Sequence, residues 1–151
     1  MAYEVHHHPY FMKQLEGLID IANASDEARE LLADISQLIE ALENNGKGIE
    51  GHEHGDPSHP IIASNFMTFA LRRTPPTYFT PLANDPPVLR IPYVWFADIH
   101  TGKDLAVMML IGDKTNLGNE WYQPIVKRIE TLLIPDWIKH NPHHKPKRKY
   151  N

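Results

Sequence analysis

Hydrophobic side chains recur with helical spacing over the first third of the chain. In residues 10–23, and again in residues 26–44, apolar positions return every three or four residues, as they do on one face of a helix. Ser25 stands between the two runs as a favourable N-cap, and Asp26 and Glu27 add negative charge to the first turn of the second run. The pattern therefore predicts two packed helices.

Three later segments have the patterns of β-strands. Residues 66–73 alternate between apolar and other side chains, residues 88–97 are rich in β-branched and aromatic side chains, and residues 105–111 are apolar at both parities. Residues 98–103 predict a hairpin turn between the last two strands. The proline-rich residues 74–87 predict a rigid connection, because proline cannot donate to a strand ladder.

A last helix is expected over residues 125–133. Together these elements predict an α+β fold, in which two N-terminal helices pack on a small antiparallel sheet and a C-terminal helix closes it. We assign residues 1–138 to one domain. Residues 139–151 are expected to form a basic, mobile tail, since they carry five of the 15 cations and no acid.

The composition excludes several classes of protein. The sequence has no cysteine, which rules out disulfides, thiolate metal sites and cysteine nucleophiles. No apolar run approaches the roughly 20 residues of a membrane-spanning helix, and residues 1–8 lack the pattern of a signal peptide. We therefore expect a cytoplasmic protein without a membrane partner. The sequence leaves open whether His6, His7 and His8 are native or an added tag.

The order of motifs in the second half of the chain resembles a known family. The segments that carry the resemblance are Phe69–Arg73, Val88–Phe96, Ala106–Thr115 and Trp121–Tyr122. One strand contains Leu-Arg near its end, a second contains Arg-Ile-Pro-Tyr, and a third closes in Gly-Asp-Lys-Thr before a helix that begins with Trp-Tyr. This order resembles the RelE/ParE superfamily of bacterial toxins, and its HigB-like branch in particular, over about residues 9–134.

The resemblance implies a small sheet with helices on one face and a basic, concave opposite face. Many members of the superfamily cleave mRNA on the ribosome and are silenced by an antitoxin protein, whereas ParE-type members poison gyrase. The resemblance therefore implies a toxin with endoribonuclease activity that uses no metal or other cofactor. Its partners would be an antitoxin and RNA or the ribosome, and a homodimer is a further option.

Metal-independent RNA cleavage needs a proton acceptor, a proton donor and cations around the phosphorus. The candidate catalytic residues are Arg72, Arg90, Tyr93 and His100. The candidate substrate-binding residues are Arg73, Lys114, Tyr78 and Tyr122. Arginine binds phosphate bidentately, tyrosine offers a hydroxyl or a stacking face, and histidine titrates near neutral pH. Strand alternation places Arg72 on the face opposite Leu71.

Two other interpretations remain open. One is a catalytically inert interaction module of the same fold, in which the arginines are buried or paired with acids such as Asp98 or Asp113. The other is a metal protein, since the polar loop 46–60 holds potential ligands. These ligands are His52, Glu53, His54, Asp56 and His59. Because no helix or strand fixes their spacing, a solvated loop without metal is the stronger prediction.

Overall fold

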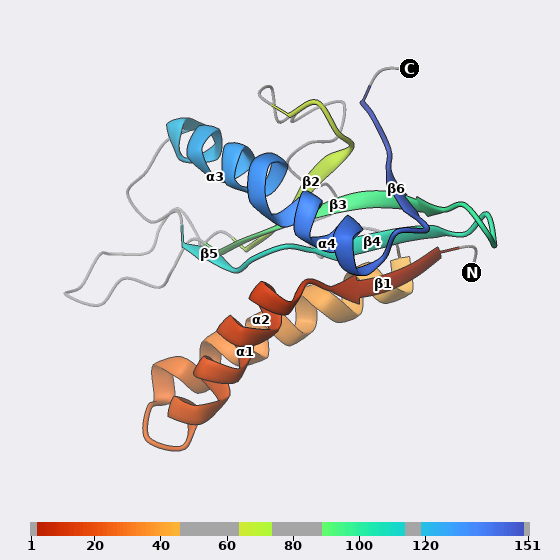
Figure 1. Ribbon diagram of the computed structural model, residues 1–151. Coiled ribbons are helices and arrows are strands. Elements are labelled where there is room, and N and C mark those ends of the chain that lie inside the picture. The colour runs from red at the N-terminus through yellow and green to blue at the C-terminus, as the bar shows by residue number, and fades with distance from the viewer. Residues whose placement is uncertain (1–2, 46–63, 74–88, 114–118, 150–151) are drawn as a thin grey trace.

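The structure is a computed structural model that describes residues 3–45, 64–73, 89–113 and 119–149 (Figure 1). Its first elements are β1 (Tyr3–His7), α1 (Pro9–Ala22), α2 (Asp26–Asn45) and β2 (Thr68–Arg73). The next are β3 (Leu89–Asp98), β4 (Asp104–Met108) and β5 (Gly112–Asp113). The last are the short turn η1 (Asn119–Trp121), α3 (Tyr122–Arg128), the π-helical segment η2 (Ile129–Leu133), α4 (Ile134–His140) and β6 (His144–Pro146). Among these described residues, no helix combines the length and the apolar character needed to cross a membrane.

The described strands form one sheet in the order β1-β4-β3-β2, with β5 and β6 paired to the two ends of β3. The α+β fold is confirmed, and β2, β3 and β4 lie where the sequence predicted strands. The sequence predicted an antiparallel sheet, whereas the sheet is mixed, because β1 lies parallel to β4. β1 itself was not predicted. Its alternating pattern extends over only five residues, Tyr3–His7, which is a weak signal.

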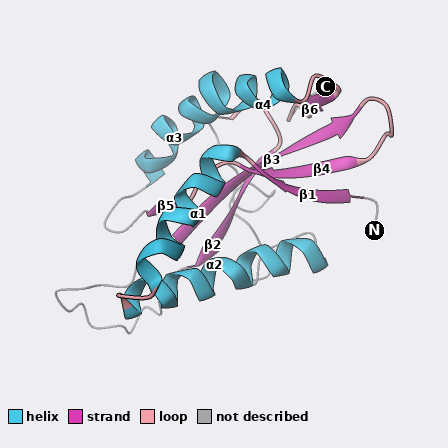
Figure 2. Ribbon diagram, turned by 60° about the horizontal axis from the view of Figure 1, so that its bottom comes forward, coloured by secondary structure: helices cyan, strands magenta, loops and turns pink. Residues whose placement is uncertain are grey.

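Helices cover both faces of this sheet (Figure 2). On β3, Leu89, Ile91 and Tyr93 face α1 and α2. Val94 and Phe96 face the other way and pack against η2 and α4. The resemblance implied an open second face, whereas in the structure the C-terminal helical segment lies across part of it.

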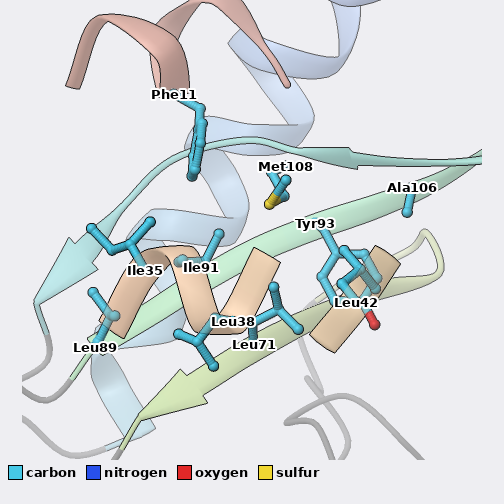
Figure 3. Close-up of a cluster of buried hydrophobic side chains, with 10 residues drawn as sticks. All are labelled: Phe11, Ile35, Leu38, Leu42, Leu71, Leu89, Ile91, Tyr93, Ala106 and Met108. Carbon is cyan, nitrogen blue, oxygen red and sulfur yellow. The ribbon is translucent and has the colours of Figure 1, made fainter. Parts of the chain in front are cut away.

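The core under α1 and α2 joins both helices to β2, β3 and β4 (Figure 3). It consists of Phe11, Ile35, Leu38, Leu42, Leu71, Leu89, Ile91, Tyr93, Ala106 and Met108. Successive side chains of a strand point to opposite faces, so this core also fixes which residues of β2 and β3 point to the second face.

The two predicted N-terminal helices are confirmed to within one residue at each end. Ser25 caps α2, since its Oγ accepts a hydrogen bond from the backbone N–H of Ala28 at 3.2 Å. The cap of α1 was not predicted. His8 Nδ1 accepts the N–H of Tyr10 at 3.0 Å, and Pro9 occupies the first helical position, where its missing N–H costs nothing.

The C-terminal helical segment runs further than predicted. The sequence pattern placed its end at Leu133, whereas helical structure continues to His140. Within the segment lies a π turn, in which the N–H of Ile134 donates to the carbonyl of Ile129. A proline removes one backbone donor, and this wider turn lets the helix pass Pro135 without ending.

The basic tail is part of the sheet. β6 pairs with Phe96–Asp98 at the end of β3, and Lys147 Nζ lies 2.7 Å from Asp104 Oδ1. Arg148 forms a further bridge with Phe66, and its guanidinium carbon lies 5.0 Å from the centre of that ring. The backbone of the tail therefore completes the edge of β3, while Lys147 meets an acid and Arg148 an aromatic ring.

Candidate functional site

Two arginines meet across β2 and β3. Arg72 lies directly opposite Arg90 in the antiparallel register, so both side chains project from the same face of the sheet. This is the face opposite Leu71, as strand alternation predicted. Two like charges in this position repel each other, and together they favour the binding of an anion.

Tyr122 contacts Arg90 from the first turn of α3. Arg90 Nε donates a hydrogen bond to Tyr122 Oη at 3.1 Å, and Arg90 Nη1 donates to the carbonyl of Leu89 at 2.9 Å. Arg90 is 6% exposed and Tyr122 is 5% exposed, whereas Arg72 is half-buried. We call Arg72, Arg90 and Tyr122 the arginine–tyrosine cluster, of which Arg72 is the outermost member.

Burial raises the pKa of the Tyr122 hydroxyl above its usual value, and the nearby charges of Arg90 and Arg72 oppose this rise only in part. Tyr122 therefore keeps its proton at neutral pH. In this state the hydroxyl accepts the hydrogen bond from Arg90 and can donate its own proton elsewhere. Its chemistry is that of an acid rather than a base.

A close contact between Gly112 and Trp121 positions this tyrosine. Gly112 in β5 lies opposite Arg90, and a Cβ atom at that position would lie 2.4 Å from Trp121 Cζ2 and 2.8 Å from Trp121 Cη2. A glycine is therefore required for the indole ring to sit here. Because Trp121 directly precedes Tyr122, its contact with Gly112 fixes the start of α3 beside Arg90.

The structure does not bring Tyr93 or His100 to this cluster. Tyr93 is fully buried in the core under α1 and α2, on the opposite face of the sheet from Arg90. His100 lies in the turn after Asp98, at the other end of β3, and eight residues of strand span about 26 Å. The prediction that Tyr93 and His100 share one catalytic site with the arginines is therefore wrong.

The remaining predicted residues lie outside the part of the chain that the structure describes. They are Tyr78, Lys114 and the potential metal ligands His52, Glu53, His54, Asp56 and His59. The backbone of Arg73 ends β2, but its side chain is not among the described ones. Their substrate-binding and metal-binding assignments stay predictions.

A second group of titratable side chains lies at the far end of β3. Asp98 Oδ2 lies 3.7 Å from His143 Nε2 and 3.8 Å from His144 Nε2. Asp98 Oδ1 accepts hydrogen bonds from the backbone N–H groups of His100 at 2.8 Å and Thr101 at 3.1 Å. No sequence pattern predicted this group, because only the pairing of β6 with β3 brings the two histidines to the carboxylate.

The group of Asp98, His143 and His144 has the residue types of a zinc site, but its hydrogen bonds oppose one. His144 Nδ1 accepts a hydrogen bond from Trp137 Nε1 at 3.0 Å, and an indole nitrogen can only donate. The neutral ring of His144 therefore carries its proton on Nε2, the atom on which a metal would need a lone pair. The group is a polar corner that holds β6 on the β3–β4 hairpin.

Mild acid is expected to destabilise the fold through three histidines. Burial lowers the pKa of His7, of His8 and of His144, so the unfolded chain binds more protons than the folded one as the pH falls. Their contribution to stability is fully present above the ordinary histidine pKa of about 6.5 and is lost progressively below it. Urea unfolding between about pH 8 and pH 5 measures this loss.

The variant His8→Asn tests the titration of His8 apart from its role as the cap of α1. Asparagine keeps an acceptor for the N–H of Tyr10 but does not titrate, so the pH dependence should become shallower. His140→Asn is the matched control, because the side chain of His140 is 68% exposed. The explanation fails if both variants show the pH dependence of the wild type.

Comparison with known proteins adds no relative: no family model, curated protein or solved structure matches the chain.

Proposed function

We propose that this protein is a toxin of a toxin–antitoxin system, a metal-independent endoribonuclease that binds RNA phosphate at the arginine–tyrosine cluster. The observation that carries the proposal is the position of Arg72 directly opposite Arg90, with the hydroxyl of Tyr122 bound to Arg90. A guanidinium group presents planar, paired donors that match the oxygens of a phosphodiester. The resemblance of residues 69–122 to HigB-like toxins supports RNA as the substrate and an antitoxin as the partner.

In the proposed reaction, the 2′-oxygen of the RNA attacks the phosphorus, and the bond from phosphorus to the 5′-oxygen of the next nucleotide breaks. Arg72 meets the phosphate first, and Arg90 lies behind it. Both stabilise the negative charge that grows on the non-bridging oxygens. Tyr122 gives its proton to the departing 5′-oxygen, since its raised pKa has kept that proton in place. The proton of the 2′-hydroxyl leaves to water.

A second candidate is a catalytically inert protein of the same fold that binds a protein partner. It is supported by the deep burial of Arg90 and Tyr122, which would then serve the fold alone. An open groove of about 780 Å³ between α1 and the C-terminal helical segment would offer a docking surface, with Met12 and Leu132 exposed on its walls.

Growth of cells that express the chain separates the two candidates. Induction of the wild type should arrest growth and cleave transcripts, and Arg72→Ala should slow cleavage by about 100-fold, because a donor to the developing charge is lost. Arg72 is half-buried, so the fold should tolerate the change. Arg29→Ala is the matched control, since Arg29 lies on α2 with its side chain 55% exposed. Mapping of transcript 5′ ends at matched protein levels is the measurement.

Two outcomes would contradict the proposal. Abundant, folded wild type that leaves growth and transcripts unchanged would favour the inert module. Cleavage that persists at full rate in Arg72→Ala would place the activity away from the arginine–tyrosine cluster.

A further inference from the structure

β1 lies at one edge of the described sheet, and no described strand pairs with its outer side (Figure 2). The N–H of His8, just after β1, donates to the carbonyl of Met108 on the neighbouring strand at 2.8 Å. Successive residues of a strand point their backbone groups to opposite sides, so the even-numbered residues of β1 also face β4. The backbone groups of Tyr3, Val5 and His7 therefore point outward.

We propose that this edge pairs with the same edge of a second copy of the chain, as an antiparallel β1–β1 pair centred on Val5. Each outward-pointing residue then faces another outward-pointing one, since Val5 faces Val5 of the copy and Tyr3 faces His7. Such pairs exchange two backbone hydrogen bonds each. The two sheets become one continuous sheet with helices on both of its faces.

The side chains between these residues favour a second copy as the partner. In the pair centred on Val5, Glu4 faces His6 of the copy, and His6 faces Glu4 of the copy. These are the non-hydrogen-bonded positions, at which facing side chains approach most closely. The side chain of Glu4 is 46% exposed and that of His6 is 36% exposed, so both can be reached from the edge. The two groups already attract each other within one chain, where His6 Nε2 lies 2.9 Å from Glu4 Oε2.

Neighbouring registers are unfavourable, which makes the pairing specific. If the pair were centred on Glu4, outward-pointing backbone groups would still face one another, but Glu4 would face Glu4 of the copy. If it were centred on His6, His6 would face His6 of the copy. A centre between two residues sets outward groups against inward ones and forms no ladder. The sequence Tyr-Glu-Val-His-His is therefore self-complementary in one register.

The contact is small, because it joins five residues of each chain. Standard interfaces are larger, so we expect a weak dimer with a dissociation constant on the order of tens of micromolar. This pairing does not require the activity proposed above, because it uses only the edge of the sheet and the charges along it.

An exchange of charges tests the pairing. Glu4→Lys sets a lysine against His6 of the copy, and His6→Glu sets a glutamate against Glu4 of the copy. Each variant alone should associate about tenfold more weakly than the wild type. An equimolar mixture of the two variants should restore the dimer, because the introduced lysine then faces the introduced glutamate and His6 faces Glu4. Sedimentation velocity of the full chain over a range of concentrations measures the association.

Glu30→Lys is the matched control, because it makes the same charge change at an exposed position of α2 and should leave the dimer intact. Val5→Pro is a second probe. It removes an outward N–H that the β1–β4 ladder does not use, and it should weaken the dimer while circular dichroism shows a folded chain. A wild type that stays monomeric at millimolar concentration overturns the proposal. So does a dimer that survives both charge variants, or a mixture that fails to restore it.

Discussion

Gly112→Ala is expected to lower the free energy of unfolding by about 1–3 kcal/mol, because an added Cβ must displace the indole ring of Trp121. The ring atoms that it would meet belong to a rigid, mostly buried side chain, at 2.4 Å and 2.8 Å. Movement of Trp121 would also carry Tyr122 away from Arg90. Urea unfolding measures the loss of stability, and a shift in tryptophan fluorescence of the folded chain reports the displaced ring.

Gly17→Ala is the matched control within the same chain. Gly17 lies inside α1, and a Cβ atom there would have no heavy atom within 4 Å, so alanine should fit without strain. The free energy of unfolding should rise by about 0.5–1 kcal/mol, since glycine is unfavourable inside a helix. Equal effects of the two alanines would show that the contact between Gly112 and Trp121 is not tight.

Two single variants that each remove one partner of the Arg90–Tyr122 hydrogen bond should together lose more stability than the variant that removes both partners. Tyr122→Phe leaves the Nε donor of Arg90 buried without this acceptor, and Arg90→Met leaves the Tyr122 hydroxyl buried without this donor. Each change should lower the free energy of unfolding by about 1–3 kcal/mol. The double variant should lose less than the sum of the two, by about 1 kcal/mol, because no orphaned partner of this bond remains.

Equilibrium urea unfolding of the wild type, the two single variants and the double variant measures these free energies as a double-mutant cycle. Val126→Ala combined with Tyr122→Phe is a useful comparison, since Val126 is buried one turn along α3 and does not take part in the hydrogen bond. Strict additivity in the Arg90–Tyr122 cycle would mean that the bond does not couple the sheet to α3.

The N-terminal helices could be predicted because their signals are local. The apolar spacing, Ser25 as a cap and the acidic first turn of α2 all lie within the helices or beside them. β1 and β6 could not be predicted in the same way. Each is short, and its stability comes from a partner that is distant in the sequence, β4 for β1 and β3 for β6.

The candidate site was predicted in part, and one error was avoidable. Alternation along β2 placed Arg72 on the correct face, but its position opposite Arg90 depends on a register that no single strand encodes. Tyr93 lies three residues after Arg90 on the same strand, and this odd spacing already places the two side chains on opposite faces. The approach of Tyr122 depends on the packing of Trp121 against Gly112, which is a tertiary contact.

The pairing of β1 with β4 also determines when the chain can fold. Tyr3 is paired with Asp104, so β1 has no partner until β4 has been synthesised, about 100 residues later. α1 and α2 follow β1 directly and pack on each other, so this helical hairpin can form early. Until β4 has been synthesised, the apolar faces of this helical hairpin lack the sheet that covers them later. The yield of native protein in cells should therefore depend on chaperones that shield a nascent helical hairpin, and less on the stability of the finished fold.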